Sequence, residues 1–260
     1  LWSLQILLRQ KKAWEEYAKV RNLSFNRGTF MGPAEITGQL GDYKVSFFTA
    51  QQAGADMRSR RYVTAMELEL SEGFVDGGAA GMRQQFETNV FSLVELTRAC
   101  FPLLRASRGL VINIGSISSV LITPFAGAYC ASKAAVHALS GALRMELAPF
   151  GIQVMEVQPG AIASSFGANA SHSAEQLVSE QSPWWPVREG IRARANASQE
   201  NPTPASQFAA TLLAAVARAE RPALLRIGNG SRRLPLLQQL LPRRLMERML
   251  SKRFGLDTPL

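Results

Sequence analysis

The feature that most constrains this 260-residue chain is an alternation of short apolar runs and longer helical patterns in its second half. Leu110–Ile114 (LVINI) is rich in β-branched residues and lies between two glycines, which is typical of a strand buried on both faces of a parallel sheet. The run 152–160 (IQVMEVQPG) repeats this pattern and ends in a Pro-Gly turn. Between these runs, an alanine-rich amphipathic pattern predicts a helix from about 126 to 150 that ends at Gly151.

The same alternation continues on both sides of this segment. We predict a helix over 79–105 that stops near Pro102, a second helix over 204–219 and a strand over 223–227. Strands and helices of these lengths are joined by crossover connections. The prediction is therefore an α/β fold, a Rossmann-like doubly wound parallel sheet, with 1–260 forming a single domain.

Positive charge is concentrated at the C-terminal end of the chain. Residues 218–260 carry 10 basic and 3 acidic side chains, whereas 74–217 carry nine of each. A surplus confined to one end is not a chain-wide nucleic-acid footprint, so we expect no nucleic-acid partner. Leucines alternate with arginines at helical spacing within 231–260, which predicts a basic amphipathic helix that Pro235 and Pro242 would shorten. Its apolar face could contact a membrane surface or an anionic ligand, or could pack on the core.

Cysteine usage indicates the compartment. The chain has two cysteines, Cys100 and Cys130, which are too few for a disulfide framework and do not lie at the paired Cys/His spacing of a zinc site. We therefore expect a reducing, cytoplasmic location and no structural metal.

The densest chemical signal is formed by three polar residues between the two predicted buried strands. Tyr129 and Lys133 are four residues apart on the predicted helix and so share one face. A positive charge beside a phenol stabilises the phenolate, which makes the phenol a better proton donor near neutral pH. Ser116 follows the first buried strand, and the carboxyl ends of parallel strands are where ligands bind in such sheets.

The segment 113–162 resembles the catalytic core of the short-chain dehydrogenase/reductase family, most closely the branch that acts on hydroxysteroids, retinoids and lipid-like ketones. The resemblance implies that Tyr129 is the catalytic acid/base and that Lys133 lowers its pKa and holds the nicotinamide ribose. It implies that Ser116 positions the substrate oxygen. Asn89, in FETNVF, matches the family's fourth catalytic residue, which supports a proton-relay water.

The Pro-Gly turn belongs to the same resemblance. Pro159, Gly160 and Ile162 match the turn whose backbone approaches the nicotinamide carboxamide, and Ser164 stands where the family usually has threonine. The resemblance thus implies an NAD(P)-dependent oxidoreductase that interconverts a ketone or aldehyde and an alcohol on a lipophilic substrate. It also implies a homo-oligomer, because relatives commonly pair through the two helices that correspond to those of Asn89 and Tyr129.

The resemblance fails in the first part of the chain. We divide the chain into a divergent nucleotide half, a catalytic half and a basic C-terminal helix, at 1–74, 75–230 and 231–260. The first part lacks the family's TGxxxGxG turn after a strand and its NNAG motif. Two alignments remain open. In one, 43–50 (YKVSFFTA) is the second strand and 62–70 the third, with Glu69 at the adenine; in the other, 64–67 replaces NNAG.

Three further alternatives also remain open. Arg58, Arg60 and Arg61 favour NADP as the cofactor, with NAD as the alternative. The tryptophans of SPWWP, Trp184 and Trp185, would either line a lipophilic substrate site or anchor a covering loop to the core. The alternative function is a catalytically inactive relative that binds lipid, a membrane surface or a protein, which the missing glycine fingerprint and the basic end favour.

Overall fold

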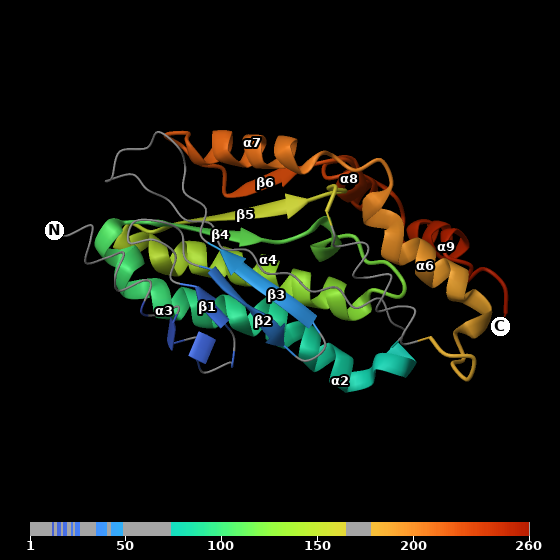
Figure 1. The fold of residues 1–260 in the computed structure, drawn as a ribbon. Coiled ribbons are helices and arrows are strands. Elements are labelled where there is room, and N and C mark those ends of the chain that lie inside the picture. The colour runs from blue at the N-terminus through green and yellow to red at the C-terminus, as the bar shows by residue number, and fades with distance from the viewer. Residues whose placement is uncertain are drawn as a thin grey trace. The chain divides into compact units, whose positions relative to one another are not determined.

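A computed structural model describes residues 74–164 and 178–259, together with three strand segments and six single positions before residue 74 (Figure 1). The strands are β1 (Ser24–Asn26), β2 (Glu35–Leu40), β3 (Tyr43–Phe48), β4 (Leu110–Ile114), β5 (Gln153–Pro159) and β6 (Leu224–Ile227). The α-helices are α2 (Phe74–Phe86), α3 (Ser92–Ser107), α4 (Gly127–Leu147), α6 (Arg188–Asn196), α7 (Ala205–Val216), α8 (Arg233–Leu240) and α9 (Arg243–Arg253). Short helical segments are η1 (Glu87–Phe91), η2 (Ile117–Ser119), η3 (Ala148–Phe150), η4 (Trp185–Val187) and η5 (Ala197–Gln199).

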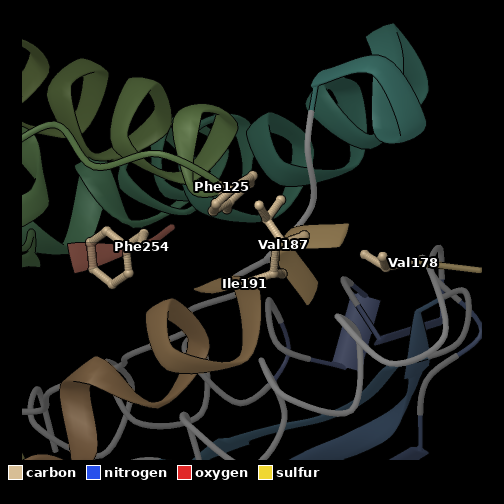
Figure 2. Packing of buried hydrophobic residues seen from close by; sticks show 5 residues of the cluster. All are labelled: Phe125, Val178, Val187, Ile191 and Phe254. Atoms are coloured by element: carbon tan, nitrogen blue, oxygen red, sulfur yellow. The ribbon is translucent and has the colours of Figure 1, made fainter. Parts of the chain in front are cut away.

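The chain forms two compact units, each with apolar clusters of its own. Unit 1 comprises Leu1–Met66, Val94–Ile112 and Leu143–Val154, and unit 2 comprises Glu67–Leu93, Asn113–Ala142 and Met155–Leu260. In unit 1, a buried cluster is packed by residues from α3, β4, α4 and β5, namely Leu147, Ile152, Val154, Phe101, Leu104, Val111 and Leu143. In unit 2, Figure 2 shows a cluster formed by Phe125, Val178, Val187, Ile191 and Phe254.

Strands β4, β5 and β6 form a three-stranded parallel sheet in that order, and Figure 1 shows them side by side. Strand β6 pairs parallel with β5. The backbone N–H of Gln153 donates to the Gly109 carbonyl at 3.0 Å. Further along both strands, Gly115 N–H donates to the Val157 carbonyl at 2.7 Å, so β4 and β5 also run in the same direction. The three predicted strands are confirmed, and the fold is the Rossmann-like arrangement of a parallel sheet with flanking helices.

Strand β5 is the best-buried strand of this sheet. Its residues 154–158 are all buried, although successive side chains of a strand point to opposite faces. Both faces of β5 are therefore covered, as the sequence pattern predicts. Helix α7 packs beside β6, which confirms the predicted helix over 204–219 within a few residues at each end.

The helix predicted over 79–105 is instead three consecutive helical segments. Helix α2 contains a kink at Gly78, where φ is +50°, and is followed by the π-helical segment η1 and then by α3. The predicted stop near Pro102 is wrong, because α3 runs on to Ser107 with Pro102 inside it. A proline removes one backbone donor and displaces the carbonyl of Arg98, and both residues are exposed, so water can satisfy that carbonyl.

The helix predicted from 126 to 150 is confirmed as α4 followed by η3. Gly151 ends it in the left-handed conformation with φ +71°, which glycine adopts without steric cost. Its N–H closes the last turn by donating to Ala148 O at 2.9 Å.

The first part of the chain contains a different kind of sheet. Strands β1, β2 and β3 form an antiparallel sheet in which Glu35 pairs with Phe48 and Leu40 with Tyr43. The strand predicted within 43–50 exists, but its described partner is the neighbouring antiparallel strand β2. The interpretation of this strand as part of the doubly wound parallel sheet is therefore wrong for the residues that the structure describes. Strand β2, which contains the glycine of EITGQL, was not predicted.

Several predicted positions lie outside the described residues. These are the segments 62–70 and 64–67 with Glu69, and Arg58, Arg60 and Arg61.

The basic C-terminal region forms two helices. Helices α8 and α9 are separated at Leu241 and Pro242, so the single helix predicted within 231–260 is interrupted where proline was expected to shorten it. Of the helices that the structure describes, none combines the length and the apolar character needed to cross a membrane.

Candidate active site

All four residues of the predicted catalytic set belong to unit 2 and are buried. Asn89 lies in η1, Ser116 lies two residues after β4, and Tyr129 and Lys133 lie in the first half of α4. Their exposed fractions are 3% for Asn89, 8% for Ser116, 3% for Tyr129 and 1% for Lys133. Polar and charged groups are rarely buried to this degree unless they are paired or functional.

Tyr129 and Lys133 lie one helical turn apart, and their side chains meet. The Lys133 ammonium lies 5.7 Å from the centroid of the Tyr129 ring, within cation–π range. The ammonium also donates to the carbonyl oxygen of Ile114 at 3.0 Å, and Ile114 is the last residue of β4. Lys133 therefore fixes this turn of α4 to the carboxyl end of β4, which is the edge where the sequence predicts the site.

Asn89 is joined to the same turn of α4 through a serine. Its Nδ2 donates to Ser132 Oγ at 3.1 Å, and Ser132 Oγ donates to the Tyr129 carbonyl at 2.8 Å. Asn89 lies in the middle of η1, and single π-helical turns inside longer helices occur frequently at functional sites. The π-turn changes the helical register at the position from which Asn89 reaches α4.

Ser116 is held as the N-cap of η2 in an extended conformation. Its Oγ accepts a hydrogen bond from Ser118 N–H at 3.1 Å, which leaves the hydroxyl proton able to donate to another oxygen. The Ser116 carbonyl accepts from Ser119 Oγ at 2.7 Å. Both bonds restrict the orientation of Ser116 relative to β4.

Sequence reasoning missed a buried polar network next to this serine. Glu156 on β5 is 1% exposed, and its carboxylate contacts His137 Nδ1 at 2.7 Å. Gln158, also fully buried, donates from Nε2 to Glu156 at 2.9 Å and to Ser119 Oγ at 3.0 Å. The signal was present in the sequence, because a glutamate inside a buried strand must find a partner. His137 of α4 is that partner.

The Gly115 backbone approaches this network closely. A Cβ at Gly115 would lie 2.5 Å from the nearer Glu156 carboxylate oxygen, so only glycine fits at the end of β4 while Glu156 stays in place.

The Pro-Gly turn after β5 packs against the turn that follows β6. A Cβ at Gly160 would lie 2.1 Å from the Asn229 carbonyl oxygen, so a close backbone contact accounts for this glycine. The carbonyl oxygen of Ile162 accepts a hydrogen bond from Gln199 Nε2 at 3.2 Å. Ser164 lies two residues further along the chain and is exposed. Pro159 ends β5. The nicotinamide role of this turn stays a prediction.

Residues 178–196 lie within the loop 165–203 that the resemblance implies covers the substrate, and we call them the covering segment. Apolar packing attaches them to the rest of unit 2. Trp184 and Trp185 pack against the cluster of Figure 2, and the Trp184 ring meets Phe125 edge-on at 5.6 Å between centroids. These contacts are those expected of anchoring tryptophans. On α6, the buried Arg194 donates from Nε to Thr123 Oγ1 at 2.6 Å, which joins the covering segment to the loop before Tyr129.

Metal-ligating side chains do not gather in the described residues. No three His, Cys, Asp or Glu side chains of 74–164, 178–259 and the described earlier positions lie close enough together to hold a metal ion.

Comparisons with known proteins show what the segment that carries this site is similar to. Residues 71–175 match the family model for short chain dehydrogenases. The crystal structure of a short-chain dehydrogenase from Streptomyces avermitilis superposes with a TM-score of 0.55 at 27% identity, over 74% of this chain and 68% of that one. Residues 71–175 are thus similar in sequence to short chain dehydrogenases, and the fold is similar to that of a solved short-chain dehydrogenase.

Two relatives are reductases by name. The NADPH-dependent 1-acyldihydroxyacetone phosphate reductase of Saccharomyces cerevisiae is 27% identical over 184 residues, which is 70% of this chain and 61% of the yeast protein. The 3-ketodihydrosphingosine reductase of Bacteroides thetaiotaomicron is 44% identical over 90 residues, or 34% of each chain. The chain thus matches less than two thirds of the length of either relative.

Proposed function

We propose that this chain is an NAD(P)-dependent oxidoreductase that interconverts a ketone or aldehyde and an alcohol on a lipophilic substrate, with NADP as the preferred cofactor. The observation that carries the proposal is the buried pair of Tyr129 and Lys133, fixed to the end of β4 and joined to Asn89 through Ser132. Burial of the Lys133 ammonium costs folding free energy, so its retention in the core beside a phenol favours a functional role.

Proton transfer at the substrate oxygen is assigned to Tyr129. When a carbonyl is reduced, its oxygen gains negative charge and needs a proton, which the phenol donates. The adjacent Lys133 ammonium stabilises the phenolate that remains, because the interaction occurs away from water at a site 1% exposed. In the oxidation direction, the phenolate accepts the proton from the alcohol.

Ser116 is assigned to the orientation of the substrate oxygen. Its Oγ accepts from Ser118 N–H, and its hydroxyl proton can still be donated to the substrate oxygen. Asn89 acts as a positioning residue through Ser132 and as the support for a relay water, the second role being implied by the family resemblance alone.

The residues at the end of β4 suit the nicotinamide end of a dinucleotide. The ammonium of Lys133 and the hydroxyl of Tyr129 can bind ribose hydroxyls, and the backbone at Ile162 follows the neighbouring strand β5. When bound, the dinucleotide supplies or accepts the hydride. NADP is favoured because the yeast relative is NADPH-dependent by name, and NAD is the alternative.

The lipophilic substrate class is supported by the names of the relatives. The yeast and Bacteroides reductases are both named for ketone-bearing lipids. The steroid, retinoid or acyl-lipid identity within this class, the cytoplasmic location and the homo-oligomer stay predictions.

The test combines nucleotide binding with turnover. We expect saturable binding of NADPH, weaker binding of NADH, and nucleotide-dependent reduction of at least one member of a panel of steroid, retinoid and long-chain ketones. Tyr129→Phe should lower turnover by about 10²–10⁴-fold and leave nucleotide affinity nearly unchanged, because one general acid contributes that range. Ser140→Ala, which removes another buried hydroxyl of α4, is the matched control and should keep turnover in the folded fraction.

Two outcomes would contradict the proposal. Binding of neither nucleotide would favour the catalytically inactive relative. Full turnover in Tyr129→Phe would remove Tyr129 from proton transfer.

A further inference from the structure

The C-terminal helices expose apolar side chains that nothing in the described fold covers. Leu236 and Leu240 of α8 are 53% and 69% exposed, and Leu245 and Met249 of α9 are 44% and 52% exposed. One of the two interpretations of the sequence was that the apolar side chains of this region pack on the core. That interpretation is wrong for these three leucines and this methionine. We call them, together with the basic residues between them, the C-terminal basic–apolar surface.

The helical spacing groups these residues into stripes. Leu236 and Leu240 are four residues apart on one face of α8, and Arg232 precedes the helix at the same interval. On α9, Leu245 and Met249 are four apart, and Arg248 and Lys252 lie beside them on the same side of the helix.

The opposite side of α9 is packed into unit 2. Met246 is 7% exposed and Phe254, directly after the helix, is 2% exposed. Phe254 belongs to the cluster of Figure 2, and Leu250 packs against that cluster. A Cβ at Gly190 would lie only 2.0 Å from the Phe254 carbonyl oxygen, so α6 and the end of α9 are in direct backbone contact. The exposed side chains are thus held in place by an anchored helix.

The charge of this surface is strongly positive. Residues 232–253 carry seven basic side chains and one acidic side chain, Glu247. Glu247 pairs with Arg243 at 2.6 Å, and Arg253 pairs with Glu200 at 2.6 Å. In the part of the chain that the structure describes, no ion pair holds the other five, which are Arg232, Arg233, Arg244, Arg248 and Lys252.

We propose that the C-terminal basic–apolar surface docks on an anionic lipid bilayer. Leucine and methionine side chains can enter the boundary between headgroups and acyl chains, while arginine and lysine contact acidic headgroups. Each basic residue near an anionic leaflet strengthens binding by about fivefold.

The charge and the exposed apolar side chains of this surface disfavour a second copy of the chain or a nucleic acid as the partner. A second copy docked through the same surface would bring two strongly positive patches together. A nucleic acid would attract the arginines and leave the four exposed apolar side chains without an apolar environment.

Docking would also bring the covering segment close to the bilayer, because Trp184, Trp185 and Ile191 share the packed cluster with Phe254 and Leu250. This consequence rests on the proposed function, since it matters only for a lipophilic substrate. The docking itself does not depend on catalysis.

The test is co-sedimentation of the full chain with vesicles. We expect binding to vesicles of phosphatidylcholine mixed with phosphatidylglycerol, weak binding to phosphatidylcholine alone, and a loss of binding as salt is raised. The variant L236S/L240S/L245S/M249S should bind at least about tenfold more weakly, because it loses all four apolar contacts. The variant R232Q/R233Q/R244Q/R248Q should lose the preference for anionic vesicles.

Controls separate docking from folding and from catalysis. Leu213→Ser on α7 removes another exposed leucine, 43% exposed, and should bind like the unchanged chain. All surface variants should keep their melting temperature and their nucleotide affinity. Tyr129→Phe should bind vesicles normally, so a failure of the proposed catalysis is distinguishable from a failure of docking.

Three results would overturn docking on lipid. One is equal vesicle binding by the unchanged chain and both surface variants. Another is binding of duplex DNA, but not of vesicles, that the serine substitutions leave intact. The third is concentration-dependent self-association that the serine substitutions abolish while vesicle binding is absent.

Discussion

Two regions of unit 2 reverse the usual distribution of side chains, in opposite directions. The candidate active site buries an ammonium, a phenol and an amide, whereas α8 and α9 expose leucines and a methionine. An exposed leucine alone is ordinary, but buried charge and grouped exposed apolar side chains are informative. Burial of the polar groups costs folding free energy, whereas exposure of the apolar side chains forgoes the stabilisation that their burial would give. The contrast supports the two proposals, a polar reaction away from water at the first region and an apolar partner outside the chain at the second.

The hydrogen bond between Asn89 and Ser132 in the candidate active site can be compared with a similar hydrogen bond elsewhere in unit 2. Asn113 on β4 donates to Ser140 of α4 at 2.9 Å, and Asn89 donates to Ser132 of α4 at 3.1 Å. Both are buried amide–hydroxyl bridges. Burial and hydrogen bonding alone therefore do not identify a catalytic residue, and variants must separate stability from turnover.

The largest effect is expected for Lys133→Met. Methionine has a similar volume and need not be desolvated as an ion, so we expect unfolding free energy to change by less than about 2 kcal/mol. Turnover should fall by about 10²–10⁴-fold, because the phenolate of Tyr129 loses its adjacent positive charge. Steady-state kinetics and chemical denaturation measure the two effects on one preparation.

The matched control for this prediction is Lys252→Met on the exposed surface of α9. This variant should keep turnover on a substrate delivered in solution. Unchanged turnover in Lys133→Met would show that the buried ammonium has only a structural role.

The second prediction concerns the attachment of the C-terminal region to the covering segment. Gly190→Ala places a Cβ against the Phe254 backbone, which cannot rotate away, and should destabilise the protein by about 1–3 kcal/mol or more. Gly141→Ala in α4 meets no atom within 4 Å and should stabilise the protein by about 0.4–1 kcal/mol through helix propensity and a restricted unfolded chain. Thermal unfolding of the two variants measures the difference, and equal melting temperatures would contradict the close contact.

The third prediction compares the two asparagine bridges. Asn89→Ala and Asn113→Ala should each cost about 1–3 kcal/mol of stability, because each leaves a buried serine without its donor. Only Asn89→Ala should also lower turnover per folded molecule, since Ser132 lies in the turn that carries Tyr129. If both variants lose turnover equally, the assignment of Asn89 to the site fails.

Much of the catalytic half follows from local patterns. The strands at 110–114 and 153–159 were predictable because β-branched residues bounded by glycine or a Pro-Gly turn have few other low-energy conformations. Helix α4 follows from alanine propensity, and the end of the helical region at Gly151, after η3, follows from the positive φ that glycine tolerates. The pairing of Tyr129 with Lys133 follows from the helical repeat alone.

Other features depend on distant contacts and were not predictable. The π-turn at 87–91 has no sequence signature, and its place becomes meaningful through Asn89 and Ser132, which are 43 positions apart. The continuation of α3 through Pro102 depends on solvent exposure of that turn. The antiparallel pairing of β3 was missed because a strand pattern does not state which strand is its neighbour.

The sequence by itself determined the strands β4, β5 and β6, the helices α4 and α7, the single helical face shared by Tyr129 and Lys133, and the basic character of the C-terminal end. These are local properties of propensity, periodicity and charge. Only the tertiary structure decided that the Lys133 ammonium reaches the Ile114 carbonyl, that Glu156 is paired with His137, and that Leu236, Leu240 and Leu245 are exposed. The physical reason is that hydrogen-bond partners and solvent exposure are set by residues far away in the chain, which no local pattern records.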